Sequence, residues 1–176
     1  MWWKKIVSWM QEQDKKIISK WEKKYDLKYD YYFNDQYYLN LNTIPPKLWI
    51  KIIYDRTYNK EYMIRHYLIN LSPLFKIVIH NFKQSDPDGA LHDHPWLFWG
   101  TYILEGGYWE HHEKGKTFMN KGSVRFHGPT FLHRVELDPN IKETWTLFFM
   151  GPKIRKWGFV KNNTKEWIPQ EQYLKN

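Results

Sequence analysis

From residue 74 onward the sequence consists of short segments rich in β-branched and aromatic residues, each followed by a turn signal. The segment Leu74–Phe82 leads into the turn Ser85–Gly89, in which Asp can bond the backbone ahead, Pro fixes φ and Gly accepts a positive φ. The other strands predicted in this region are Trp96–Leu104, Tyr108–His112, Thr117–Met119, Gly122–His127, Leu132–Leu137 and Thr144–Met150. Short strands at close and regular spacing are typical of a β-sandwich or a β-barrel.

The first quarter of the chain has a different pattern. Residues 2–24 predict an amphipathic helix, because apolar residues recur at the spacing of one helix face, with lysines around the rest. The face predicted to be buried contains Trp2, Ile6, Trp9, Gln13, Ile17 and Trp21. A basic amphipathic helix can lie on a membrane surface. The preferred interpretation is a helix packed over one end of the domain.

Between this helix and the β-rich region the pattern is less regular. Tyr25–Asn42 predicts one or two short strands, and Pro45-Pro46 stops regular structure. Lys47–Tyr54 and Glu61–Leu71 alternate as strands do, although Pro46–Tyr54 also fits a short helix. A length of 176 residues suffices for one domain with its own core, and neither repeats nor a linker divide it. We expect an N-terminal helix and extension (residues 1–60), a barrel (61–160) and a tail (161–176).

Composition limits the chemistry available to the chain. The absence of cysteine excludes disulfides, thiolate metal sites and thiol nucleophiles, so that a bound metal needs imidazole, carboxylate or water ligands. No apolar run approaches the length that crosses a bilayer. The start MWWKKIVSWMQEQDKK is not a secretory signal, because charge returns after a short apolar stretch. We therefore expect a cytoplasmic protein that does not bind membranes.

The net charge of +8 raises the question of nucleic acid. The lysines, however, are spread over both termini and interleaved with acidic residues, instead of forming one stripe. They include Lys4, Lys5, Lys15, Lys16, Lys23, Lys24, Lys153, Lys156, Lys161 and Lys165. A solvated basic surface is the preferred interpretation, attraction of an anionic substrate is the second, and nucleic-acid binding is disfavoured.

Histidines provide the sharpest chemical signal. His92 and His94 are two apart, so on an extended strand both imidazoles point to one face while Asp93 points away. A strand leaving Gly122, a turn at Gly128-Pro129 and a return strand would place His133 beside them. Three imidazoles suit Fe(II), Zn(II), Ni(II), Cu(II) or Mn(II), and a site with three ligands leaves positions for substrate, water or O₂. The alternative is a set of core or surface histidines without a metal.

These two segments resemble the two motifs of the cupin superfamily. The first has the His92-Asp-His94-Pro pattern, a strand and the turn Glu105-Gly-Gly; the second begins at Gly122, turns near Pro129 and ends in His133. Residues 61–159 further resemble a little-studied group of small bacterial and phage cupins. The matching segments are Ser85–Trp96, Gly106–Glu110, Leu132–Arg134 and Thr146–Phe159. The resemblance implies an all-β fold, a single cupin jelly-roll barrel, with a metal on His92, His94 and His133.

One position departs from the commoner cupin pattern. Many metal cupins carry a glutamate five residues after the second histidine, where this chain has Trp99. The site therefore resembles that of the three-histidine cupins, among them the thiol dioxygenases. Glu110, on the next strand, is a candidate to reach the pocket, and direct ligation by Glu110 or Glu105 is the less favoured alternative. A neutral triad leaves Fe(II) at net charge +2, which favours an anionic substrate.

Other residues are candidates for the pocket. Arg125 alternates with Val124 and Phe126, so it can point into the barrel as an anion clamp, or else pair with Glu136 or Glu143. Trp99 is expected to face the metal, and His127 to lie near the barrel mouth. Structural roles are expected for Arg134, Arg155 and His66, a place in the core or beside a ligand for His80, and exposed positions for His111 and His112.

The leading hypothesis is a metal-dependent cupin enzyme, and the favoured form is an Fe(II) dioxygenase of a small anionic substrate. One alternative is a metal-assisted isomerase or lyase acting on a sugar or sugar phosphate, with Zn(II), Ni(II) or Mn(II) as Lewis acid. Another is a cupin that binds a ligand without catalysis. We expect a homodimer, because barrels of this size commonly pair through their sheet edges.

Overall fold

The computed structural model describes residues 1–25, 49–55, 60–86, 89–161 and 165–174. Its helices are α1 (Trp2–Tyr25) and α2 (Gln170–Tyr173). Its strands are β1 (Ile50–Tyr54), β2 (Glu61–Leu71), β3 (Phe75–Phe82), β4 (Leu91–His92), β5 (Trp99–Glu105), β6 (Gly107–His112), β7 (Gly115–Asn120), β8 (Val124–His127), β9 (His133–Leu137), β10 (Thr144–Met150), β11 (Gly158–Val160) and β12 (Trp167–Pro169). The predicted all-β architecture preceded by an N-terminal helix is confirmed.

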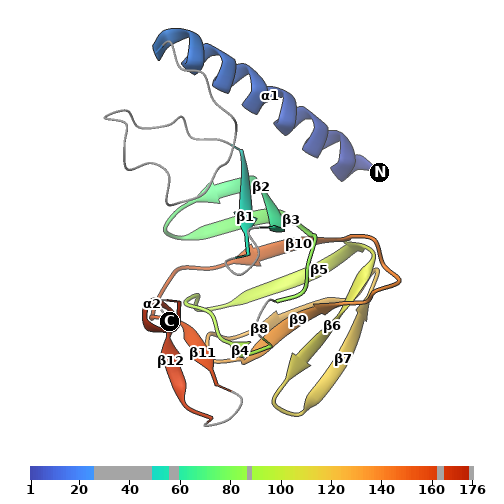
Figure 1. Ribbon diagram of the computed structural model, residues 1–176, viewed down its shortest axis with the longest axis vertical. Helices are drawn as coiled ribbons and strands as arrows, with labels where there is room; N and C mark the ends of the chain where they lie inside the picture. The colour runs from blue at the N-terminus through green and yellow to red at the C-terminus, as the bar shows by residue number, and fades with distance from the viewer. Residues whose placement is uncertain (26–48, 56–59, 87–88, 162–164, 175–176) are drawn as a thin grey trace.

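The strands form two antiparallel sheets of six strands that pack face to face (Figure 1). The first has the order β1-β2-β3-β10-β5-β8, and the second the order β12-β11-β4-β9-β6-β7. Strands distant in sequence are therefore neighbours: β10 lies between β3 and β5, and β9 lies between β4 and β6. These crossovers bring the two histidine segments together.

The space between the sheets contains two hydrophobic clusters. One joins residues of both sheets: Met63, Phe82, Ile103, Tyr108, Met119 and Val135. The other consists of Val78, Trp99, Phe148 and Met150, with Tyr67, Trp96 and Phe131 packed against it. Burial of each large apolar side chain contributes about 1.5–3 kcal/mol. The second cluster borders the histidines.

Helix α1 covers the outer face of the first sheet (Figure 1). Trp3 and Val7 pack on Ile79, Leu104 and Trp145, and the rings of Trp3 and Trp145 lie 4.6 Å apart. The buried carboxylate of Asp14 accepts hydrogen bonds from the backbone N–H groups of Trp49 and Ile50, both at 2.9 Å. These bonds tie the helix to the start of β1.

The predicted buried face of the helix was wrong by about one residue. Trp2 and Trp9 are 58% and 48% exposed, whereas the buried set is Trp3, Val7, Met10 and Asp14. Both sets have the three-to-four spacing of a helix face, so periodicity could not distinguish them. The side chain of Trp21 lies outside the described residues.

Several predicted boundaries differ from those observed. The strand predicted from Trp96 begins at Trp99, because Trp96 instead forms an isolated bridge with Lys153. Strands β4, β11 and β12 and helix α2 were not predicted, and the sheets extend past residues 61–160 through β1 and β12. The predictions for Tyr25–Asn42 and Pro45-Pro46 lie outside the described residues. Neither described helix has the length and apolar character required to cross a membrane.

His66 makes stability depend on pH. It is 1% exposed, its Nδ1 lies 3.3 Å from the carbonyl oxygen of Ile79, and burial lowers its pKa from 6.5 to about 4. As the pH falls below 6.5, His66 of the unfolded chain binds a proton, whereas His66 of the folded chain stays neutral until about pH 4. The free energy of unfolding therefore decreases between about pH 6.5 and 4, by up to about 3 kcal/mol. Urea unfolding should show the stability advantage of the wild type over His66→Gln shrinking across this range. An unchanged difference would contradict the assignment.

Candidate metal centre

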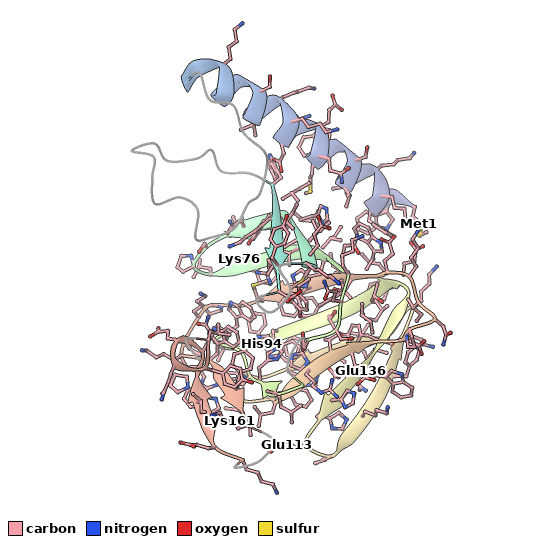
Figure 2. The ribbon with its side chains drawn as sticks, viewed as in Figure 1. Met1, Lys76, His94, Glu113, Glu136 and Lys161 are labelled. Carbon is pink, nitrogen blue, oxygen red and sulfur yellow. The ribbon has the colours of Figure 1, made fainter. Side chains whose placement is uncertain are left out.

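Three imidazoles converge between the two sheets. His92 on β4 is the register partner of His133 on β9, and His94 follows two residues after His92. One nitrogen from each ring forms a group whose atoms all lie within 4.8 Å of one another. Nε2 of His94 and Nε2 of His133 are 2.9 Å apart. Figure 2 shows His94 in the interior of the barrel.

The closest pair of donors, on His94 and His133, has a separation that suits ligation of one divalent ion. With metal–nitrogen bonds of about 2.0–2.1 Å, two imidazole nitrogens at the observed separation subtend about 90° at the ion. Burial lowers the pKa of His94 well below its usual value, and the neighbouring His133 and His92 lower it further. The neutral form, which has a free lone pair for a metal, is therefore favoured.

Two buried carboxylates lie behind the imidazoles. Oε1 of Glu110 is 3.1 Å from Nδ1 of His133, and Oδ2 of Asp86 is 3.8 Å from Nδ1 of His92. Asp86 also accepts hydrogen bonds from the backbone N–H of Val135, at 2.7 Å, and from the hydroxyl of Tyr62. A carboxylate within hydrogen-bond distance, as Glu110 is, fixes the orientation and tautomer of a ligating histidine. Glu110 thus supports a candidate ligand through a hydrogen bond.

The charge of Glu110 is balanced locally. Burial alone would raise its pKa, but the hydrogen bond with His133 and the proximity of His133, His127 and Arg125 lower it overall. Nε of Arg125 lies 3.4 Å from Oε2 of Glu110, and Nε2 of His127 lies 4.0 Å from the same oxygen. Glu110 is therefore ionised at neutral pH.

Aromatic rings enclose the cluster. Trp99 is fully buried, and its ring centroid lies 4.5 Å from those of both His94 and His133. Its Nε1 donates to the carbonyl of Gly128 at 3.1 Å. Trp96 stacks on His94 at 5.0 Å, and His127 stacks on Phe131 at 3.6 Å. The imidazoles therefore face a largely apolar environment.

The orientation of Arg125 follows its alternation with exposed Val124 and Phe126. The ion-pair partner suggested by sequence was wrong, because Arg125 pairs with Glu110 instead of Glu136 or Glu143. Those two acids have other partners: Glu136 contacts Arg134 and His111, and Glu143 contacts Lys83. All three acids lie within 18 positions of Arg125 in the sequence. Distance along the chain therefore did not reveal which carboxylate lies inside the barrel with Arg125.

The remaining histidines have defined contacts. His80 is buried and its Nε2 accepts a hydrogen bond from Nε of Arg65 at 3.0 Å. The exposed positions expected for His111 and His112 were wrong: both are partly buried. Nε2 of His111 lies 2.8 Å from Glu136, and Nε2 of His112 lies 3.3 Å from the hydroxyl of Thr117.

Sequence reasoning missed two residues near the cluster, Asp86 and Arg65. Asp86 was interpreted only as a turn residue, and nothing in the sequence linked it to His92. Arg65 occupies the centre of the predicted strand Glu61–Leu71, two residues from Met63 and Tyr67. Its alternation with these apolar residues was the signal that could have placed it inside the barrel.

No protein-family model and no curated protein matches the chain. Among solved structures, the polyketide cyclase RemF from Streptomyces resistomycificus matches with a TM-score of 0.50 and 17% identity, over 59% of this chain and 75% of that one. The chain has the cupin fold.

Two further cupin-fold structures are similar at lower TM-scores. Fe(II)-HppE in complex with (S)-1-HPP matches at 14% identity and a TM-score of 0.46, over 57% of this chain. A putative mannose-6-phosphate isomerase from Ralstonia eutropha JMP134 matches at 20% identity and 0.46, over 51% of this chain and 84% of that one. The present chain spans 55% of the length of the HppE chain. At these identities the likeness concerns the fold.

Proposed function

We propose that this cupin is a metal-dependent enzyme in which His92, His94 and His133 hold one divalent ion, with Fe(II) favoured. The observation that carries the proposal is the convergence of three imidazole nitrogens within 4.8 Å, inside an aromatic enclosure. Three protein ligands leave coordination positions open, as catalytic sites require. Imidazole ligands suit iron as well as zinc, copper and nickel.

The favoured reaction is a dioxygenation of a small anionic molecule. Bound Fe(II) would supply the capacity to react with O₂, which the side chains of this chain lack. The protein contributes the surroundings: Glu110 orients His133, Asp86 places a carboxylate near His92, and Trp99 and Trp96 exclude water. Because the three ligands are neutral, the site retains the charge of the ion and favours a negatively charged substrate.

The alternative of a metal-assisted isomerase or lyase has its own support. Such reactions move a proton within the substrate, and His127 and Glu110 lie 4.0 Å apart beside His133. One of these groups can accept a proton that the other returns. This reaction would consume no O₂ and would run with Zn(II) or Ni(II) as Lewis acid.

Elemental analysis of the protein purified without a histidine tag distinguishes these proposals, together with an O₂ electrode and a panel of small carboxylates and sugar phosphates. Near-stoichiometric iron with substrate-dependent O₂ uptake supports the dioxygenase. Zinc or nickel with no O₂ uptake supports the isomerase or lyase. Failure to bind any metal, even after anaerobic reconstitution with Fe(II), would contradict both proposals and leave a non-catalytic binding protein.

A homodimer is also proposed. Strand β8 ends the first sheet, and its outward residues Val124 and Phe126 are 60% and 63% exposed. The ring of Phe126 stacks on that of Phe98 at 5.7 Å, which extends the apolar surface. An apolar edge strand of this kind suits pairing with a second copy.

A further inference from the structure

Arg65 is a cation on the inner face of the first sheet. On β2 it alternates with Met63 and Tyr67, which pack in the two hydrophobic clusters between the sheets. His66 and Leu68, which follow Arg65 and Tyr67 in the chain, face the opposite side, toward α1 and Trp145. Arg65 therefore projects into the barrel, where it is only partly buried.

The charge of Arg65 has no carboxylate partner among the described residues. Its Nε donates to Nε2 of His80 at 3.0 Å, and the two outer guanidinium nitrogens make no hydrogen bond within the described part of the chain. The three other arginines that the structure describes each contact an acid: Arg125 with Glu110, Arg134 with Glu136 and Arg155 with Asp93. Because Arg65 is only partly buried, these two nitrogens are open to a bound anion.

Arg65 is linked to the candidate metal centre through His80 and Phe148. The ring of His80 stacks on Phe148 at 5.0 Å, and the centroid of Phe148 is 6.1 Å from that of His94. One aromatic layer therefore links the surroundings of Arg65 to the imidazole cluster.

Thr146, whose hydroxyl has no hydrogen-bond partner among the described residues, lies in the same cross-strand row as Arg65. Arg65 is the register partner of His80, and His80 is the register partner of Thr146 on β10. Thr146 is 1% exposed, and its hydroxyl makes no hydrogen bond within the described residues. Buried hydroxyls are normally satisfied, so this one is available to a ligand or a water molecule.

We propose that Arg65 is the anion-binding residue of the barrel and holds the carboxylate or phosphoryl group of a small ligand. Two free guanidinium nitrogens present the fork that matches two oxygens of such a group. Arg125, which the sequence suggested as the anion clamp, instead pairs with Glu110, the carboxylate that hydrogen-bonds His133. The identity of this ligand as the substrate of the metal centre rests on the proposed function, whereas anion binding at Arg65 does not require the metal.

Calorimetric titration with inorganic phosphate and, separately, with sodium acetate tests this proposal on the full-length protein as purified and on its His94→Ala variant. We expect Arg65→Met to weaken binding of the preferred anion at least about tenfold, because charge-assisted hydrogen bonds are lost. Arg65→Lys keeps the charge but not the fork, so a smaller loss is expected. Arg134→Met, which removes an arginine paired with Glu136, is the matched control and should bind like the wild type. Whichever anion binds more tightly identifies the carboxylate or phosphoryl class.

Each outcome has a distinct meaning. Binding that persists in His94→Ala but is lost in Arg65→Met supports the anion site even where the metal centre fails. Equal affinity in the wild type and Arg65→Met, an equal loss in Arg134→Met, or no binding of either anion would overturn the proposal. Circular dichroism and metal content establish that Arg65→Met is folded. If it is not, Arg65→Lys decides the matter, since wild-type affinity there would exclude bidentate recognition.

Discussion

Replacing His94 with alanine is expected to abolish stoichiometric metal binding. The change removes one of three imidazoles whose nitrogens lie within 4.8 Å, including the Nε2 that is 2.9 Å from that of His133. Mutation of a residue that only orients a ligand typically lowers metal affinity about 10–100-fold, which corresponds to about 1.4–3 kcal/mol. Loss of the ligand itself is therefore expected to cost more. Elemental analysis and a competitive titration with a chromogenic chelator measure the effect.

A histidine outside the cluster provides the control. His111 lies on β6, where it contacts Glu136 and Arg134, so His111→Ala should retain metal at wild-type stoichiometry. Both variants remove one imidazole from the protein, which separates a specific site from general binding by surface histidines. Wild-type metal content in His94→Ala, or equal losses in both variants, would contradict the assignment of the centre.

Replacing Asp93 with alanine is expected to lower the free energy of unfolding by about 3–5 kcal/mol, because a buried carboxylate loses an ion pair and two further hydrogen bonds. Asp93 is 2% exposed and lies between His92 and His94, pointing away from them. Its Oδ1 accepts the backbone N–H of Gly158 at 2.7 Å. Its Oδ2 accepts hydrogen bonds from Arg155 and, at 3.0 Å, from Nε1 of Trp167. One carboxylate thus ties β11 and β12 to the loop that carries His94.

Urea unfolding monitored by tryptophan fluorescence measures this effect. Asp93→Asn preserves the shape and an acceptor oxygen but loses the charge, so an intermediate loss of stability is expected. Glu113→Ala, at the exposed turn between β6 and β7, is the control and should change stability by less than about 0.5 kcal/mol. A loss below about 1 kcal/mol in Asp93→Ala would show that the C-terminal strands do not depend on this carboxylate.

The helix and the histidines show how far sequence patterns reach. The extent of α1 followed from its periodicity, but the direction of its buried face did not, because tryptophans at positions 2 and 3 support two overlapping faces. For the histidines, strand alternation and motif spacing predicted a meeting of His92, His94 and His133, and the structure brings them together. The predicted strand through His94 was wrong, because β4 ends at His92 and His94 lies on the loop that follows.

Partners across the barrel were beyond local reasoning. Arg125 was expected to point inward, and its neighbours Val124 and Phe126 point outward. That its partner is Glu110 depends on β8 closing the first sheet opposite β6 of the second, a relation that neither strand encodes alone. The same holds for Asp86 beside His92, and for Arg65 beside His80.

The sequence by itself determined the class of the fold, the inward and outward residues of its regular strands, and the three imidazoles that are candidates to bind a metal. These properties follow from the two-residue period of strands and from the limited chemistry of a chain without cysteine. Only the tertiary structure decided which charges meet. It paired Glu110 with His133 and Arg125, and Asp93 with the C-terminal strands. It left the guanidinium of Arg65 without an acid among the described residues. The physical reason is that contacts between strands depend on the order of strands in the sheets.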